Sequence, residues 1–229
     1  MTLFRDRVEA GRILAERLLA LHPAEPVVLA LPRGGVPVGF EVAKALQAPL
    51  DVVIVRKIGA PDQPELAVGA VVNGGRPELF VNEGIRRDLD LSDEWLQQAM
   101  QRQLSEIERR HALYRGRRAQ APIAGRTAIV VDDGIATGAT VRAALIAIRR
   151  AGPTRLVLAV PVAPPDMAES LREEVDDLVC LAMPEPFYAI GAFYQDFGQT
   201  SDEEVIALLA KAAKWGEGGK PAAGKSTNT

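Results

Sequence analysis

The chain has 229 residues but a single cysteine, few aromatic residues and no excess of positive charge. Because a lone cysteine cannot form an internal disulfide, the sequence favours a cytoplasmic location. Cys180 lies in the apolar run LVCLAM, without charged neighbours that would favour its thiolate, so we expect a core residue rather than a nucleophile. The net charge of −3 argues against nucleic acid as the main partner.

Several motifs that would indicate other functions are also missing. No apolar run approaches the roughly 20 residues of a transmembrane helix, and the interspersed charges of MTLFRDRVEAGRILAERLLAL are unlike a signal peptide. Histidines and cysteines do not occur at metal-ligand spacing. We therefore expect neither a membrane protein nor a protein built around a structural metal.

The last residues, 215–229, are rich in Gly, Lys, Ser and Thr and are predicted to be disordered. Within them, GKPAAGKS at 219–226 matches the P-loop pattern of nucleotide-binding proteins letter for letter. A P-loop works only between a buried strand and a helix, whereas no apolar run precedes this stretch and three residues follow it. A nucleotide hydrolase is therefore disfavoured, and residues 1–214 are expected to form the functional domain.

Buried strands and helices alternate along the remaining sequence. Continuous apolar runs predict strands at 27–31, 51–56, 127–133, 155–163 and 177–183. Helical periodicity predicts helices at 4–21, 38–47, 92–117, 140–152, 165–175 and 201–215. This order predicts an α/β fold with an open, mostly parallel five-stranded sheet and helices on both faces. A hairpin at 67–83 is expected to turn at Asn73-Gly74-Gly75.

The stretch VVDDGIATGAT, residues 130–140, carries the strongest functional signal. Ligands of open parallel sheets bind beyond the carboxyl ends of the strands, where this loop between a strand and a helix would lie. Small residues let backbone N–H groups approach an anion, and the helix N-terminus adds partial positive charge. The predicted phosphate-binding residues are Gly134, Ile135, Ala136, Thr137, Gly138, Ala139 and Thr140.

Two carboxylates, Asp132 and Asp133, precede this loop. Beside a phosphate alone they would repel the ligand. They are favourable if the ligand also carries sugar hydroxyls, which donate to carboxylates, or brings Mg²⁺, which prefers oxygen ligands. The alternative is that Asp-Asp-Gly is simply a turn after a strand, but the Thr-Gly-x-Thr ending favours the binding function.

The run AIVVDDGIATGAT at 128–140 resembles the phosphoribosyl diphosphate signature of type I phosphoribosyltransferases, a strand followed by two acidic residues and Thr-Gly-x-Thr. LPRGGVPVG at 31–39 resembles the pyrophosphate loop of the same family. The resemblance implies that Arg33 and the amides of Gly34 and Gly35 face pyrophosphate. It also implies a non-proline cis peptide in this loop, with Arg33–Gly34 as the candidate bond.

VVIVRKIGAPDQPELAVGAV at 52–71 resembles the second strand and flexible loop of that family. Arg56 and Lys57 stand where the family places basic residues that reach the pyrophosphate, and residues 59–65 would form a lid that excludes water. The helix expected at 92–117 is the least typical part. The combination of motifs is similar to a narrower set of predicted bacterial phosphoribosyltransferases whose substrate is unassigned.

The resemblance implies a Mg²⁺-dependent transfer of the phosphoribosyl group from phosphoribosyl diphosphate to a nitrogenous base or similar nucleophile, in a homodimer. The implied catalytic residues are Arg33, Lys57, Asp132 and Asp133, and the two aspartates would also serve the metal, directly or through water and ribose. The alternative is a non-catalytic sensor of phosphoribosyl diphosphate or a nucleotide. The retained Arg33 and Lys57 favour the enzyme.

The acceptor is not identified by the sequence. Ala136 stands where family members that act on hypoxanthine or guanine carry a third aspartate, so that design is disfavoured, and Glu65 in the lid is an alternative source of a carboxylate. The resemblance implies a small hood at about 183–200 that recognises the acceptor, unless its aromatic rings only pack the hood core. The candidate rings are Phe187, Tyr188, Phe193, Tyr194 and Phe197, and the polar candidates are Asp196 and Gln199.

Overall fold

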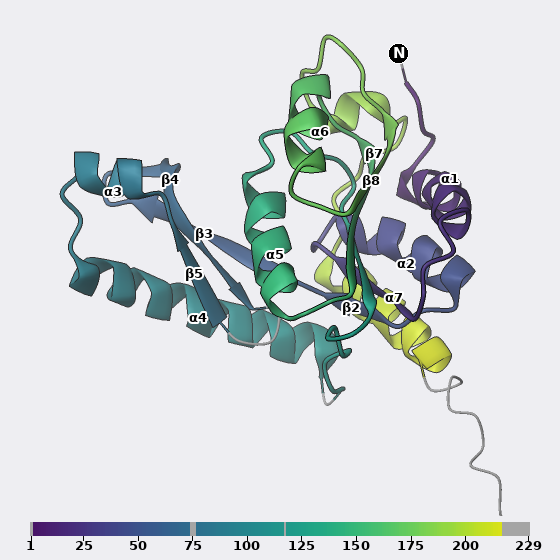
Figure 1. Cartoon of the computed structure of the whole chain (residues 1–229), viewed down its shortest axis with the longest axis horizontal. Coiled ribbons are helices and arrows are strands. Elements are labelled where there is room, and N and C mark those ends of the chain that lie inside the picture. The colour runs from purple at the N-terminus through teal and green to yellow at the C-terminus, as the bar shows by residue number, and fades with distance from the viewer. Residues whose placement is uncertain (1, 74–76, 117, 217–229) are drawn as a thin grey trace, which may run out of the picture.

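The computed structural model describes residues 2–73, 77–116 and 118–216. They form a body around a parallel sheet and an arm that extends from one side of it (Figure 1). Gly74 and Gly75 of the predicted turn, and the P-loop-like stretch at 219–226, lie outside the described residues. Within the described part of the chain, no helix has the length and apolar character needed to cross a membrane.

The body contains the predicted five-stranded sheet, in the order β2-β1-β6-β7-β8. All neighbouring strands in it are parallel, which confirms the expected fold class. The strands are β1 (Pro26–Ala30), β2 (Leu50–Val52), β6 (Thr127–Val131), β7 (Arg155–Val162) and β8 (Asp177–Ala182). Every residue of β6 is buried, because helices cover the sheet on both faces and no polar alternation is needed.

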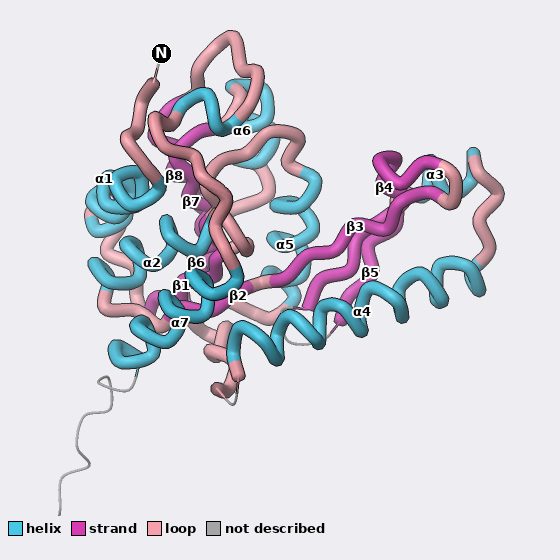
Figure 2. The backbone as a smooth tube through the Cα atoms, turned by 180° about the vertical axis from the view of Figure 1, so that it is seen from behind, coloured by secondary structure: helices cyan, strands magenta, loops and turns pink. Residues whose placement is uncertain are grey.

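Helices α1 (Arg7–Leu19) and α2 (Gly35–Leu46) cover one face of this sheet, and α5 (Ala139–Arg150) and α6 (Pro165–Arg172) cover the other (Figures 1 and 2). Successive residues of β6 point to opposite faces of the sheet. Ile129 packs in the cluster of α1 and α2, whereas Val130 packs in the cluster of α5 and α6. The last helix, α7 (Asp202–Gly216), lies against α2, with the rings of Phe40 and Trp215 5.0 Å apart.

The arm is an antiparallel sheet of β3 (Ile54–Ala60), β4 (Gln63–Asn73) and β5 (Pro77–Val81), followed by α3 (Glu83–Asp88) and the long helix α4 (Asp93–Arg115). Ser92 caps α4 as expected, since its side chain accepts a hydrogen bond from the backbone N–H of Trp95. Figure 2 shows α4 running along the arm and back to the body. The short helix α3 was not expected from the sequence.

The single strand predicted at 51–56 was wrong, because the chain divides there between two sheets. β2 ends at Val52 in the body, the backbone N–H of Val53 donates to Ala30, and β3 begins at Ile54 in the arm. The lid expected as a loop at 59–65 is the tip of the β3–β4 hairpin, with β3 ending at Ala60 and β4 beginning at Gln63. The side chain of Glu65 lies outside the described residues.

The segment 183–200 crosses the body beside the N-terminal residues. It contains one turn of 3-10 helix, η1 (Ile190–Phe193), and the backbone N–H groups of Leu3 and Phe4 donate to Phe193. Phe193 and Tyr194 are buried in a small cluster with Phe4. These two rings therefore pack the core of this segment, which was the alternative to a role in acceptor recognition.

Cys180 lies in β8 and also packs against the core. Burial raises the pKa of its thiol to about 11, and its Sγ donates to the carbonyl of Ala182 at 3.2 Å. A thiol that stays protonated is a weak nucleophile, which agrees with the structural role expected for this residue.

Candidate active site

The loop that follows β6 forms a small cavity at the carboxyl end of the sheet. β6 ends at Val131 and α5 begins at Ala139, so the loop leads directly into a helix N-terminus. Gly138 has φ of +73°, a left-handed conformation that glycine adopts without a steric penalty. The cavity measures about 180 Å³ and is lined by Asp132, residues 134–141 and Ile190, so all seven predicted phosphate-binding residues border it.

The pyrophosphate loop lies against the acidic pair. Gly34 has no room for a side chain, because a Cβ there would lie 2.0 Å from Oδ2 of Asp133. A Cβ on Gly35 would lie 2.7 Å from the carbonyl oxygen of Val131. The fold therefore brings together two motifs that are far apart in the sequence, and the glycines are required for the close approach.

A non-proline cis peptide is present in this loop, but at Pro32–Arg33 rather than at Arg33–Gly34. The expected position was wrong by one residue. The physical reason is local: Gly34 continues from the turn in a right-handed helical conformation and caps α2, which begins at Gly35, so the bond after Arg33 already belongs to the helix entry.

Asp133 is held by a set of contacts from distant parts of the chain. Its Oδ2 accepts from Nε of Arg7 at 2.8 Å, and both side chains are nearly buried, at 11% and 12% exposed. The backbone carbonyl of Asp133 accepts from the hydroxyl of Tyr194 at 2.6 Å. Arg7 also donates to the carbonyl of Gly198 at 2.7 Å, and its guanidinium lies 3.9 Å from the ring centroid of Phe197. Asp133 thus links α1 and the segment 183–200 to the loop.

Nothing in the sequence indicated Arg7, which looks like an ordinary charged residue of an amphipathic helix. Its contact with Asp133 joins the first helix to a strand end that comes much later in the chain. Only the fold brings these residues together.

Asp132, unlike Asp133, borders the cavity of the phosphate loop. Its Oδ1 accepts from the backbone N–H of Asp133 at 2.9 Å. Burial and the adjacent charge of Asp133 hold the pKa of the Asp132 carboxyl well above its usual range. A negative charge that is costly in the protein alone becomes favourable when a cation or a hydroxyl donor binds beside it.

The described residues contain no group of three or more His, Cys, Asp or Glu side chains that could hold a metal ion. Asp132 offers one carboxylate at the cavity. Mg²⁺ typically keeps several waters and binds through one or two carboxylates together with substrate phosphates. The donor set therefore fits a cation that arrives with a phosphorylated ligand.

The two basic residues of β3 point to opposite faces of the arm, as neighbours in a strand must. Arg56 is half-buried, and its Nε donates to Oε1 of Gln103 in α4 at 3.2 Å. Lys57 is exposed and borders a cavity of about 340 Å³ together with Thr137 and Arg142 on the α5 side. Lys57 is therefore close to the phosphate loop, while Arg56 faces α4.

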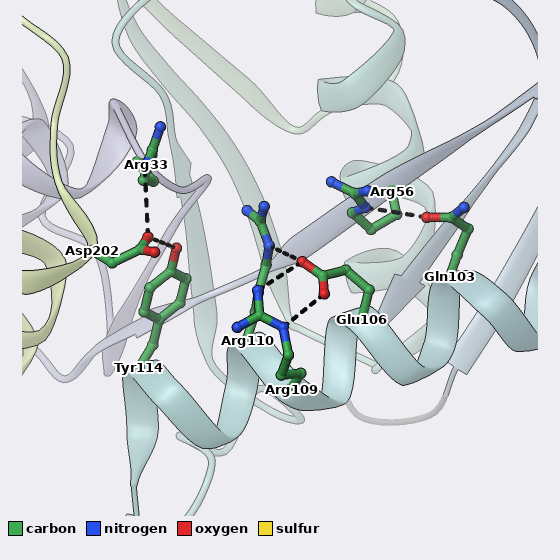
Figure 3. A network of polar contacts seen from close by, with 8 residues as sticks. All are labelled: Arg33, Arg56, Gln103, Glu106, Arg109, Arg110, Tyr114 and Asp202. Atoms are coloured by element: carbon green, nitrogen blue, oxygen red, sulfur yellow. Dashed lines mark hydrogen bonds and ion pairs between the residues drawn. The ribbon is translucent and has the colours of Figure 1, made fainter. Parts of the chain in front are cut away.

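Arg33 faces the start of α7 and the end of α4. Its Nη1 lies 3.7 Å from Oδ1 of Asp202, and the same oxygen accepts from the hydroxyl of Tyr114 at 2.6 Å (Figure 3). Burial and the hydrogen bond to Asp202 raise the pKa of Tyr114 to about 12. No sequence signal marked Tyr114 or Asp202, because each fits its helix as a core or capping residue.

The residues expected to recognise the acceptor do not line one common cavity. Ala136 is exposed beside the cavity, and Tyr188 is 85% exposed. Asp196 and Gln199 border a separate cavity of about 230 Å³, on the side of Arg7, so they do not line the cavity of the phosphate loop.

Comparisons with known proteins agree with this geometry. The chain is 50% identical, over 212 residues, to proteins from two strains of Mycobacterium tuberculosis, CDC 1551 / Oshkosh and H37Rv, whose names assign them provisionally as phosphoribosyl transferases. The alignments cover 93% of this chain and 47% of those proteins, so the chain spans about half the length of the curated relatives it matches. The crystal structure of TT1426 from Thermus thermophilus is 45% identical and superposes with a TM-score of 0.80, covering 94% of this chain and all of that one. Residues 7–194 match the phosphoribosyl transferase domain, and the chain therefore belongs to that family.

Proposed function

We propose that the protein is a Mg²⁺-dependent phosphoribosyltransferase. It would transfer the phosphoribosyl group of phosphoribosyl diphosphate to a nitrogenous base or similar nucleophile and release pyrophosphate. The observation that carries the proposal is the contact between the two loops: Gly34 of the pyrophosphate loop lies directly against Asp133 of the acidic pair. One ligand with a phosphate, a sugar and a diphosphate would fill the space that these loops border.

The loop at 134–140 would bind the 5′-phosphate through backbone N–H groups and the hydroxyls of Thr137 and Thr140. Asp132 would accept hydrogen bonds from the ribose hydroxyls, since its carboxylate borders the same cavity. Asp133 would position the pyrophosphate loop and would not contact the ligand itself. One of its oxygens already accepts from Arg7, and its carboxylate limits where Gly34 can lie.

Arg33 and Arg56 would stabilise the departing pyrophosphate, and Lys57, on the opposite face of β3, would add positive charge from the side of the phosphate loop. Fixed positive charge placed where negative charge develops is usually the largest contribution to catalysis of this kind. Mg²⁺, when bound, supplies further charge neutralisation at the diphosphate oxygens. The hairpin tip at 59–65 would cover the reacting sugar and keep water from competing with the acceptor.

The segment 183–200 would serve as the hood, with Ile190 at the phosphate loop and the exposed ring of Tyr188 as the group free to stack on a flat acceptor. Ala136 supplies no carboxylate, so recognition of the acceptor would not use the third-aspartate design. A homodimer is part of the proposal and can be tested by light scattering of the purified chain.

A screen for pyrophosphate release tests the function. The purified protein is incubated with phosphoribosyl diphosphate, Mg²⁺ and a panel of bases and amines, and Asp132→Asn serves as the inactive reference. The proposal predicts release with at least one acceptor, and at least about tenfold less with the variant. Donor binding without release across the whole panel would instead support a sensor that uses the same pocket.

A further inference from the structure

One face of α4 carries polar residues in a regular series that ends at the pyrophosphate loop. Gln103, Glu106, Arg110 and Tyr114 are spaced by three or four residues, which places them on the same side of the helix. Gln103 holds Arg56, and Tyr114 holds the Asp202 that pairs with Arg33. Both arginines expected to meet pyrophosphate are thus connected to this one face.

Arg110 lies between these two ends. With a rise of 1.5 Å per residue, Gln103 and Tyr114 are about 16 Å apart along the axis, and Arg110 is about 6 Å from Tyr114. Figure 3 shows its guanidinium directed away from α4, between Arg33 and Arg56. The positive charges of Arg110 and Arg33 both act on the phenol of Tyr114, so the two cations are electrostatic neighbours.

The neighbouring arginine, Arg109, is placed differently. Both Nε and Nη2 of Arg109 bond to Glu106, at 2.8 and 3.0 Å, and its side chain is 61% exposed. Arg110 uses only Nε on Glu106, at 2.8 Å, and its side chain is 30% exposed. Glu106 therefore orients Arg110 through one nitrogen, and the guanidinium of Arg110 is directed away from α4 (Figure 3).

We infer that Arg110 of α4 is a further pyrophosphate-binding residue, completing a row with Arg33 and Arg56 that receives the diphosphate end of the donor. The inference rests on the proposed function for the identity of the donor. Guanidinium groups suit phosphate oxygens because they donate two parallel, charge-assisted hydrogen bonds. Within the described part of the chain, this row and Arg109 pair with two carboxylates, those of Glu106 and Asp202, so a positive surplus is left that an anion would neutralise.

Calorimetric titration with two probes tests the inference: inorganic pyrophosphate with Mg²⁺, and ribose 5-phosphate. Arg110→Gln should weaken pyrophosphate binding by about tenfold or more, and leave ribose 5-phosphate binding unchanged. Arg109→Gln is the matched control, since it removes the same charge and another partner of Glu106 but should change neither affinity. Circular dichroism checks that each variant folds, and Arg110→Lys should retain part of the pyrophosphate affinity.

The inference is overturned if Arg110→Gln binds pyrophosphate like the wild type, if Arg109→Gln loses as much affinity, or if the wild type binds no pyrophosphate. It does not depend on turnover. The protein could bind pyrophosphate through Arg110 and yet release none from phosphoribosyl diphosphate. That result would support the role of Arg110 and contradict only the proposed reaction.

Discussion

The loop after β6 and the row of Arg33, Arg56 and Arg110 are both candidate sites for negative charge, but they are built in opposite ways. The loop offers backbone N–H groups of small residues at a helix N-terminus, and its position is fixed by the Gly34–Asp133 contact and the Arg7 ion pair. The row offers long side chains from the pyrophosphate loop, β3 and α4, which are partly exposed. Close packing and a nearly buried ion pair hold the first in place, whereas the side chains of the second are held by partly exposed polar contacts.

This difference has a consequence for mutations. Changes to the contacts that hold the loop in place, at Gly34, Asp133 or Arg7, should affect stability and activity together, because these contacts maintain both the fold and the site. Changes in the row should affect binding of the ligand with little change in stability, because exposed ion pairs contribute little to folding.

The largest effect is expected for Gly34→Ala. The added Cβ would need the space of the Asp133 carboxylate, so the pyrophosphate loop and the acidic pair must separate. We expect a loss of about 3 kcal/mol of stability, with pyrophosphate release falling below detection. Gly198→Ala is the control, since a Cβ there meets its nearest neighbour at 3.5 Å. Normal denaturation and activity of Gly34→Ala would show that the loops are not held together as described.

Arg7→Ala should be nearly as damaging to stability. It leaves the nearly buried charge of Asp133 without the partner at 2.8 Å, at a cost of about 3 kcal/mol. The control is Arg5→Ala, just before the same helix, because the side chains of Arg5 and its partner Glu9 are 63% and 34% exposed and the change should cost less than about 1 kcal/mol. Urea denaturation measures both, and equal losses would remove the distinction between a bracing pair and a surface pair.

Asp132→Asn should separate function from stability at the loop. The raised pKa of Asp132 means that its folded form binds protons more readily than its unfolded form, so its charge destabilises the metal-free protein at neutral pH. We expect the variant to be more stable than the wild type at pH 7, while turnover falls. The difference should shrink as the pH falls toward about 4, near the unfolded value, as thermal denaturation across pH would show. A variant that is less stable at pH 7 would contradict the assignment.

The smallest effect is expected for Tyr114→Phe, which removes a contact of Asp202, the partner of Arg33 in the row. Without the hydroxyl at 2.6 Å, Asp202 would draw Arg33 closer and make it less available to the ligand. We expect kcat/KM for the donor to fall a few-fold, and stability to fall by about 1 kcal/mol. A large fall in stability instead would mean that the contacts around the row, like those of the loop, help to hold the fold together.

The body of this fold was predictable because its signals are local. Fully apolar strands alternate with helices, and their order was sufficient to predict that residues 134–140 form a loop at the carboxyl end of the sheet, where ligands of such sheets bind. The arm was harder, because Val52 and Ile54 are both apolar and nothing between them marks the division into two sheets. The cis bond was misplaced by one residue because the sequence does not show where the turn ends and α2 begins.

The contacts that organise the site could not be predicted, because they join residues far apart in the chain. Arg7 with Asp133, Tyr114 with Asp202 and Arg56 with Gln103 each depend on how whole elements pack. Sequence motifs predicted which residues would bind a ligand, but not which residues hold them in place.

Phosphorus NMR of phosphoribosyl diphosphate tests the central claim most directly. In the presence of protein, Mg²⁺ and an acceptor found in the screen, the account predicts that the diphosphate signals of the donor convert to free pyrophosphate while its 5′-phosphate signal moves to that of the phosphoribosylated acceptor. Conversion should require the acceptor and should be lost in Asp132→Asn. Donor signals that broaden on binding but never convert, with any acceptor, would contradict the proposed transfer.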